Sequence, residues 1–198
     1  MKRNLIISIF AFFAVALLAE DRIGSYTMSY FDGKEYEIEA SEPKNGKFSI
    51  YLYVGGDRKS DKVCIGIDSK DLQAFKTSLE QIRDKFLEWE KTAKDNNVTD
   101  INKDFPYSFP KVTIAWLGSK WWFSFNKHLK PKFMVFKDGS CAMVVYMKVK
   151  ASSNEYIDQD VYWVLQNVDE FNSIIDMLDE NIVMEHYNNK GNKTDLFQ

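Results

Sequence analysis

Five large aromatic side chains have the clearest potential to bind a ligand, because each stands on a segment that alternates like a strand. They are Tyr51, Tyr53, Trp122, Tyr146 and Tyr162. Their neighbours are apolar residues predicted to face a core, and successive side chains of a strand point to opposite faces. The rings are therefore expected on outer sheet faces, where they could stack on sugars, nucleobases or a partner's side chains. Alternatively, two outer faces pack together and bury them.

Three lysines complete the predicted binding surface: Lys120, Lys127 and Lys132, all close in sequence to Trp121 and Trp122. Their charge would favour an anionic ligand, whereas such a lysine-rich run is also typical of a solvated hairpin. We expect the ligand to be an unknown protein, or a small anionic or saccharide molecule.

Catalytic and metal-binding signatures are absent from the sequence. Its two histidines, His128 and His186, belong to no zinc-protease motif, and no serine-hydrolase, phosphate-loop or dinucleotide-binding motif occurs. Asp57 and Asp61 flank a turn, but a calcium loop needs more oxygen ligands at fixed spacing. The sequence therefore predicts a protein that is not an enzyme, with no catalytic residues, no metal site and no cofactor. A hydrolase with an unfamiliar site is the alternative.

The N-terminal segment, residues 1–19, has the plan of a secretory signal peptide, because Lys2 and Arg3 precede an apolar run and then small residues. The run is shorter than the roughly 20 residues that span a bilayer. We predict cleavage and a mature chain without a transmembrane segment, in the periplasm or outside the cell. An exported chain could join Cys64 to Cys141, although two buried apolar thiols are the simpler expectation.

The elements that position these residues show a repeated pattern. Apolar strands at residues 63–67 and 161–165 each lead directly into a capped helix with an apolar stripe. Laying Leu72 on Val168 makes four further apolar positions coincide, and strand patterns precede both units in matched order. The sequence therefore predicts an α+β fold of two ββββα repeats, with antiparallel sheets that each pack one helix on the inner face.

The predicted division of the chain follows from this repeat. It consists of a signal peptide (1–19), a first repeat (20–96), a linker (97–110), a second repeat (111–187) that forms one compact domain with the first, and a polar tail (188–198). The linker is assigned because residues 94–104 are polar and prolines follow them.

A tandem of four-strand-plus-helix units resembles the Whirly and PUR-type single-stranded nucleic-acid-binding folds. The resemblance is one of architecture, and it rests on residues 63–86 and 161–182 and on the Trp121–Trp122 hairpin. It implies sheets that present aromatic and basic residues to a single strand, with helices packed between them. The signal peptide and the net charge of −3 argue against nucleic acid as the partner.

The leading hypothesis is an exported, non-enzymatic binding or interaction protein of unknown ligand. A single-stranded nucleic-acid-binding protein of Whirly or PUR type is the first alternative, and the hydrolase is the second. The leading hypothesis depends on the aromatic side chains of the outer faces being exposed, and the structure can show whether they are.

Overall fold

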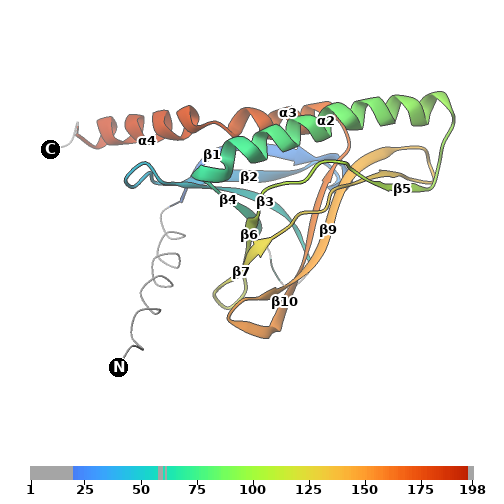
Figure 1. Cartoon of the computed structure of the whole chain (residues 1–198). Coiled ribbons are helices and arrows are strands. Elements are labelled where there is room, and N and C mark those ends of the chain that lie inside the picture. The colour runs from blue at the N-terminus through green and yellow to red at the C-terminus, as the bar shows by residue number, and fades with distance from the viewer. Residues whose placement is uncertain (1–19, 58–59, 61, 196–198) are drawn as a thin grey trace.

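Ten antiparallel strands form one sheet in the computed structural model, which describes residues 20–57, 60 and 62–195 (Figure 1). The strands are β1 (Glu20–Met28), β2 (Lys34–Ser41), β3 (Ser49–Gly56), β4 (Val63–Asp68), β5 (Ile101–Asp104), β6 (Val112–Leu117), β7 (Trp121–Lys127), β8 (Lys132–Val135), β9 (Cys141–Ala151) and β10 (Asn154–Leu165). The helices are η1 (Ser29–Phe31), η2 (Ser69–Asp71), α2 (Leu72–Asp95), α3 (Val168–Met177) and α4 (Glu180–Asp195).

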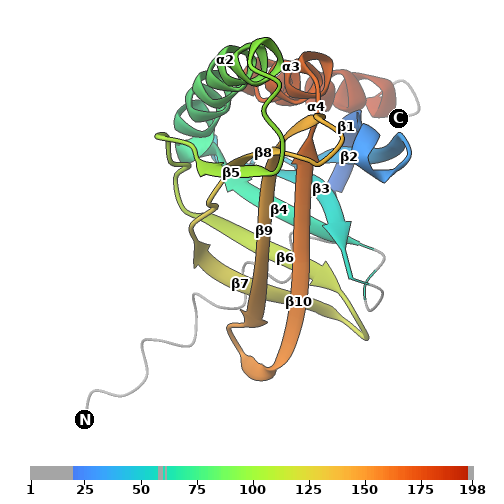
Figure 2. The same cartoon turned by 90° about the vertical axis from the view of Figure 1, so that its right-hand side faces the viewer.

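The sheet has two sections that meet at a narrow seam. The first section has the order β1-β2-β3-β4-β6-β7, and the second has the order β5-β8-β9-β10. Strand pairing joins them where β10 meets the end of β3, through Val161 with Gly56 and Tyr162 with Gly55. Hydrogen bonds between β7 and the β9–β10 hairpin join them a second time, among them the one from the Ser152 N–H to the Phe123 carbonyl (2.8 Å). Figure 2 shows the long β9–β10 hairpin running across the first section, with its tip pointing away from the helices.

The core lies between the helices and the inner faces of both sections. Residues at helical spacing on α2 are fully or almost fully buried: Leu72, Phe75, Leu79, Ile82 and Phe86. The ring of Phe86 lies 5.4 Å from that of Phe171 on α3 and 5.8 Å from that of Phe133 on β8. Trp163 of β10 is fully buried and stacks on Phe75. The apolar stripe predicted from the sequence is therefore the surface on which the second section packs.

The start of α3 explains how the N-terminal hairpin is held. The side chain of Asn167 accepts a hydrogen bond from the backbone N–H of Glu170 (3.1 Å), as its spacing predicts. The buried Glu170 carboxylate accepts from the N–H of Gln166 (2.6 Å) and from the N–H of Ser29 in η1 (2.7 Å). One carboxylate therefore fastens η1 to the end of β10.

The α+β class is confirmed, with a large antiparallel sheet and helices packed on it. The arrangement as two ββββα repeats is not confirmed, because strands from both predicted halves share one sheet. In particular, β6 pairs directly with β4 through Val63 with Trp116 and Ile65 with Ile114. Without β6, β4 would be an edge strand with unpaired backbone groups. The β6–β7 hairpin pairs with this edge and therefore extends the first sheet instead of starting a second one.

Two predicted irregular segments contain regular structure. Strand β5 lies within the predicted linker 97–110, where it pairs with β8 and all four of its residues are exposed. Helix α4 continues through most of the predicted tail, as far as Asp195. The predicted signal peptide, residues 1–19, lies outside the described residues. Among the described helices, none is long and apolar enough to span a membrane. Cys64 and Cys141 are buried thiols on different sections, as expected.

Candidate functional site

Tyr51 and Tyr53 lie on the predicted side of their strand but are not exposed. Side chains of cross-strand pairs share a face, and Tyr51 pairs with Glu39, whereas Leu52 pairs with the core residue Ile38. Both tyrosines keep only 6% of their surface accessible. The Tyr53 hydroxyl donates a hydrogen bond to the Glu39 carboxylate (2.9 Å), so the polar end of this tyrosine already has a partner within the protein.

Trp122 faces the opposite way from the prediction. It pairs with the buried Trp116 of β6 and therefore points to the core side, while Trp121 and Phe123 occupy the outer face. The pairing of β6 with β7 shifts by one residue near Asn126, whose φ is 56°. This bulge lies beyond Trp122, and residues 121–124 alternate without interruption. The prediction failed because it assigned the more aromatic side of the strand to the core, whereas the buried side carries Trp122 and the fully buried Ser124.

The lysines near the Trp121–Trp122 hairpin do not join one binding surface. The Lys120 ammonium lies 4.6 Å from the Trp122 ring, and Lys127 is half-buried at the end of β7, opposite Val112. Lys132 lies on β8 in the other section, where it forms an ion pair with Asp104 (3.4 Å).

Tyr146 and Tyr162 are brought together as predicted, on the outer face of the second section. They pair across β9 and β10, and their rings stack with centroids 5.1 Å apart. Tyr146 is 55% exposed. Its hydroxyl donates to Asp160 (3.2 Å), whose charge raises the pKa of Tyr146 and keeps the hydroxyl protonated. We call this surface, with the neighbouring Val144, the tyrosine face.

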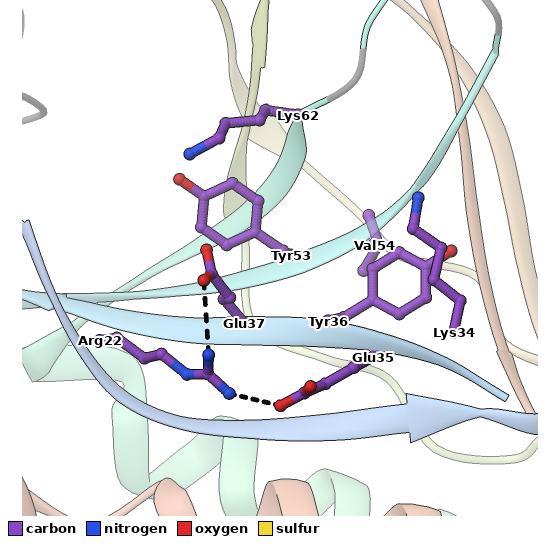
Figure 3. A pocket seen from close by; sticks show the side chains of 8 residues that line it. All are labelled: Arg22, Lys34, Glu35, Tyr36, Glu37, Tyr53, Val54 and Lys62. Atoms are coloured by element: carbon purple, nitrogen blue, oxygen red, sulfur yellow. Dashed lines mark hydrogen bonds and ion pairs between the residues drawn. The ribbon is translucent and has the colours of Figure 1, made fainter.

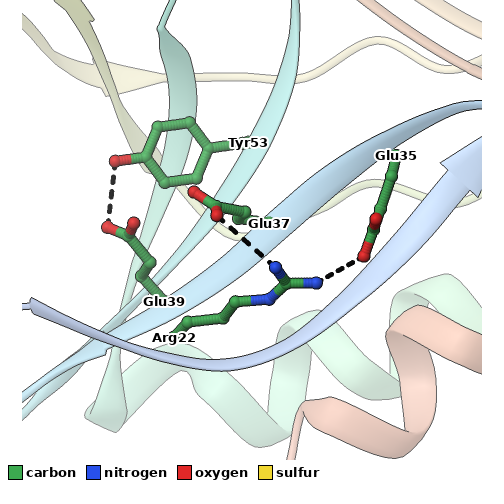
Figure 4. Close-up of polar contacts among 5 residues, drawn as sticks. All are labelled: Arg22, Glu35, Glu37, Glu39 and Tyr53. Atoms are coloured by element: carbon green, nitrogen blue, oxygen red, sulfur yellow. Dashed lines mark hydrogen bonds and ion pairs between the residues drawn. The ribbon is translucent and has the colours of Figure 1, made fainter.

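A charged pocket of about 210 Å³ lies beside Tyr53 on the first section (Figure 3). Its lining residues come from β1, β2, β3 and the start of β4: Arg22, Lys34, Glu35, Tyr36, Glu37, Tyr53, Val54 and Lys62. Figure 4 shows the Arg22 guanidinium between Glu35 and Glu37, with Tyr53 turned to Glu39. Hydrogen bonds from the Ser25 hydroxyl and from Arg22 lower the pKa of Glu35. The charged groups of this pocket are thus largely occupied with one another.

A second and larger hollow, of about 840 Å³, opens on the second section. It is lined by residues of η1, β5, β8, the β8–β9 turn and the end of β10: Ser29, Tyr30, Asp100, Ile101, Asn102, Met134, Val135, Phe136, Lys137, Asp138, Ser140 and Gln166. Its size lies within the usual range for small-molecule sites. We call it the aromatic groove.

Two stacked rings form one wall of the aromatic groove. The ring of Tyr30 lies 5.8 Å from that of Phe136 at an angle of 22°, and Tyr30 remains 49% exposed. The wall depends on the position of η1, which the buried Glu170 carboxylate holds through Ser29. Asn167 adds a hydrogen bond from its amide to the Ser29 hydroxyl (3.3 Å).

Most polar side chains at the rim of the aromatic groove have no partner among the described residues. Within the part of the chain that the structure describes, the side chains of Asp100, Asn102 and Gln166 make no hydrogen bond or ion pair. Asp138 accepts from the N–H and hydroxyl of Ser140 (3.0 and 2.7 Å), and these bonds lower its pKa. Amide and carboxylate groups at this rim therefore remain available to a ligand.

The aromatic groove and the tyrosine face lie on the same side of the second section. Met134 pairs with Ala142, which is followed on the same face of β9 by Val144 and Tyr146. The distance along β9 from Ala142 to Tyr146 is about 14 Å at roughly 3.4 Å per residue. A ligand longer than one ring could contact both.

Sequence reasoning found the tyrosine face but missed the aromatic groove. Tyr30 continues the alternation of Tyr26 and Met28, which favours a strand, but it lies in η1. Asn102 lies in the predicted linker 97–110. The one available signal was the turn Asp138-Gly139, which brings Phe136 and Ser140 together. The described residues contain no cluster of three or more potential metal ligands. The chain matches no protein-family model, no curated protein and no solved structure.

Proposed function

We propose that this chain is an exported, non-enzymatic binding protein that holds its ligand against the tyrosine face and the aromatic groove. The observation that carries the proposal is the stacked pair Tyr146–Tyr162, with Tyr146 more than half exposed on the same side of the second section as a hollow of about 840 Å³. Exposed aromatic rings can stack on a ligand, and exposed apolar surface that is gathered in one place is typical of a binding site.

The tyrosine pair is also suited to binding because it is already ordered. The Tyr146 hydroxyl donates a hydrogen bond to Asp160, and the Tyr146 ring stacks on Tyr162. Because both contacts already restrict the side chain, a ligand would remove little of its conformational freedom. Binding loses less conformational entropy when the receptor groups are pre-positioned. Export, which the N-terminal segment predicts, is the second part of the proposal.

The proposal is tested with the mature chain, residues 20–198, and three probes that represent different ligand classes. The probes are a neutral hexasaccharide set (malto-, cello- and chito-), a random hexapeptide pool and an oligothymidylate of twelve nucleotides. Binding is measured by tryptophan fluorescence and calorimetry for the wild type, for Tyr146→Ala and for the control Tyr156→Ala. Tyr156 is 87% exposed on the same hairpin, outside the stacked pair.

Saturable binding of any probe that weakens at least tenfold in Tyr146→Ala and stays unchanged in Tyr156→Ala supports the proposed site. No saturable binding, or an equal loss in both variants, contradicts it. Binding confined to oligothymidylate, with a steep salt dependence, would instead support the nucleic-acid-binding alternative. Export is tested separately, by fractionating cells that produce the chain with and without residues 1–19; an unchanged location contradicts it.

A further inference from the structure

The chemistry of the aromatic groove points to one class of ligand, and this inference rests on the proposed binding function. The groove combines two kinds of surface. Tyr30, Phe136 and Met134 supply apolar area, while Asp100, Asn102 and Gln166 supply hydrogen-bonding groups around it. Sugar rings present the same combination, with apolar C–H faces and hydroxyl groups at their edges.

The charges at the groove argue against an anionic ligand. Two carboxylates, Asp100 and Asp138, and a single ammonium, Lys137, line it. On the adjoining tyrosine face, Lys132 is paired with Asp104 and Lys148 with Asp158. A phosphate or carboxylate ligand would therefore meet net negative charge, whereas uncharged hydroxyl groups can donate to these carboxylates.

The free amides favour a ligand that both donates and accepts hydrogen bonds. Asn102 projects from β5 on the side of Met134, because the two residues pair across β5 and β8. Gln166 directly follows Leu165, the last residue of β10, and also lines the groove. Each amide offers donors and an acceptor, and each can bind a pair of neighbouring hydroxyl groups.

We infer that the aromatic groove and the tyrosine face together bind a neutral oligosaccharide, with sugar rings stacked on Tyr30 and Tyr146. The span between the groove and Tyr146, about 14 Å along β9, favours an extended chain over a single sugar. The carboxylates and amides at the rim select hydroxyl-rich, uncharged rings.

The test compares neutral hexasaccharides with polygalacturonate as an anionic saccharide and with the oligothymidylate and hexapeptide probes. The decisive variant is Asp100→Asn, which keeps a residue that tolerates the left-handed conformation found there, with φ at 58°. Asn102→Ala and Gln166→Ala complete the set, and the control is Lys111→Ala, an exposed lysine that precedes β6 and lines neither the aromatic groove nor the charged pocket. Circular dichroism and the urea midpoint establish that each variant is folded.

The expected result is saturable binding of at least one neutral hexasaccharide, weakened about tenfold by Asp100→Asn, Asn102→Ala or Gln166→Ala and unchanged by Lys111→Ala. Preferential binding of polygalacturonate or oligothymidylate, strengthened by Asp100→Asn, overturns the inference. Tyr146-dependent binding of the peptides without any hexasaccharide also overturns it, while the proposed function stands. Absence of binding to every probe overturns both.

Discussion

The charged pocket and the aromatic groove lie on the two sections of one sheet, but they use their polar groups in opposite ways. In the charged pocket, Arg22 lies between two glutamates, and the Tyr53 hydroxyl is bound to Glu39. In the aromatic groove, Asn102 and Gln166 have no side-chain partner among the described residues. The polar groups of the charged pocket bind one another, whereas the amides of the aromatic groove are free to bind a ligand.

This difference teaches that charge alone does not mark a binding site. Ion pairs between exposed side chains contribute little to stability and must be broken before a ligand can use them. Exposed rings and amides without hydrogen-bond partners can bind a ligand without any ion pair being broken first. The comparison therefore supports the proposal that a ligand binds to the second section. The following variants test it from the largest expected effect to the smallest.

Replacing Glu170 with leucine is expected to have the largest effect. The variant removes a buried carboxylate that accepts hydrogen bonds from the N–H groups of Ser29 and Gln166, which should lower the free energy of unfolding by about 3 kcal/mol. Urea unfolding measures the loss. Asp169→Ala, in the same helical turn but exposed, is the control and should change stability far less. Wild-type stability of the Glu170 variant would show that the groove wall does not depend on this anchor.

Tyr30→Ala is expected to weaken binding of a groove ligand about tenfold, which corresponds to about 1.4 kcal/mol. The ring forms the wall with Phe136 and is half exposed, so the urea midpoint should stay close to that of the wild type. Calorimetry with the best of the probes measures the change. Tyr53→Phe, in the charged pocket, should leave the affinity unaltered. An equal loss of affinity in both variants would contradict the proposal that the ligand binds in the aromatic groove and not in the charged pocket.

Tyr53→Phe should instead affect stability. It removes a hydroxyl that donates to Glu39, and a hydrogen bond of this kind contributes about 1 kcal/mol. The urea midpoint of this variant is compared with that of Tyr156→Phe, where the hydroxyl is on a highly exposed ring. Identical midpoints would mean that the Tyr53 hydroxyl is not part of the internal network of the charged pocket.

Arg22→Ala should give the smallest effect, visible mainly in a titration. The pKa of Glu35 should rise towards its ordinary value but stay below it, because the hydrogen bond from the Ser25 hydroxyl remains. A lowered carboxyl pKa contributes stability above the ordinary value of about 4.3 and loses it as the pH falls through the folded value. Nuclear magnetic resonance of labelled Glu35 follows this shift. An unmoved pKa would contradict the role of Arg22.

Local patterns predicted the parts of this fold that depend on nearby residues. The stripe from Leu72 to Phe86 identified the buried face of α2, and Asn167 was correctly placed as a helix cap. The turn at Asp32 and Gly33 has the positive φ values that its sequence favours, 56° and 70°. These features form within a few residues, so their physical causes are visible in the sequence.

The failed predictions depend on contacts between distant segments. The more aromatic side of β7 was assigned to the core, which placed Trp122 on the outer face, but its pairing with Trp116 of β6 puts it on the core side. The aromatic groove combines Tyr30, Asn102 and Phe136, which belong to three separate elements. No local pattern shows that these elements meet, because their meeting is decided by how the strands of the sheet pair.

The hydrogen bond between Ser29 and Glu170 also has a consequence for the timing of folding. The two residues are 141 positions apart, and the bond from Tyr187 to the carbonyl of Ala40 spans 147. Contacts between such distant positions form slowly, because a long loop must close first. The groove wall is therefore completed only after nearly the whole chain has been synthesised. A chain that crosses a membrane unfolded would acquire its binding site on the far side, where the proposed ligand is met.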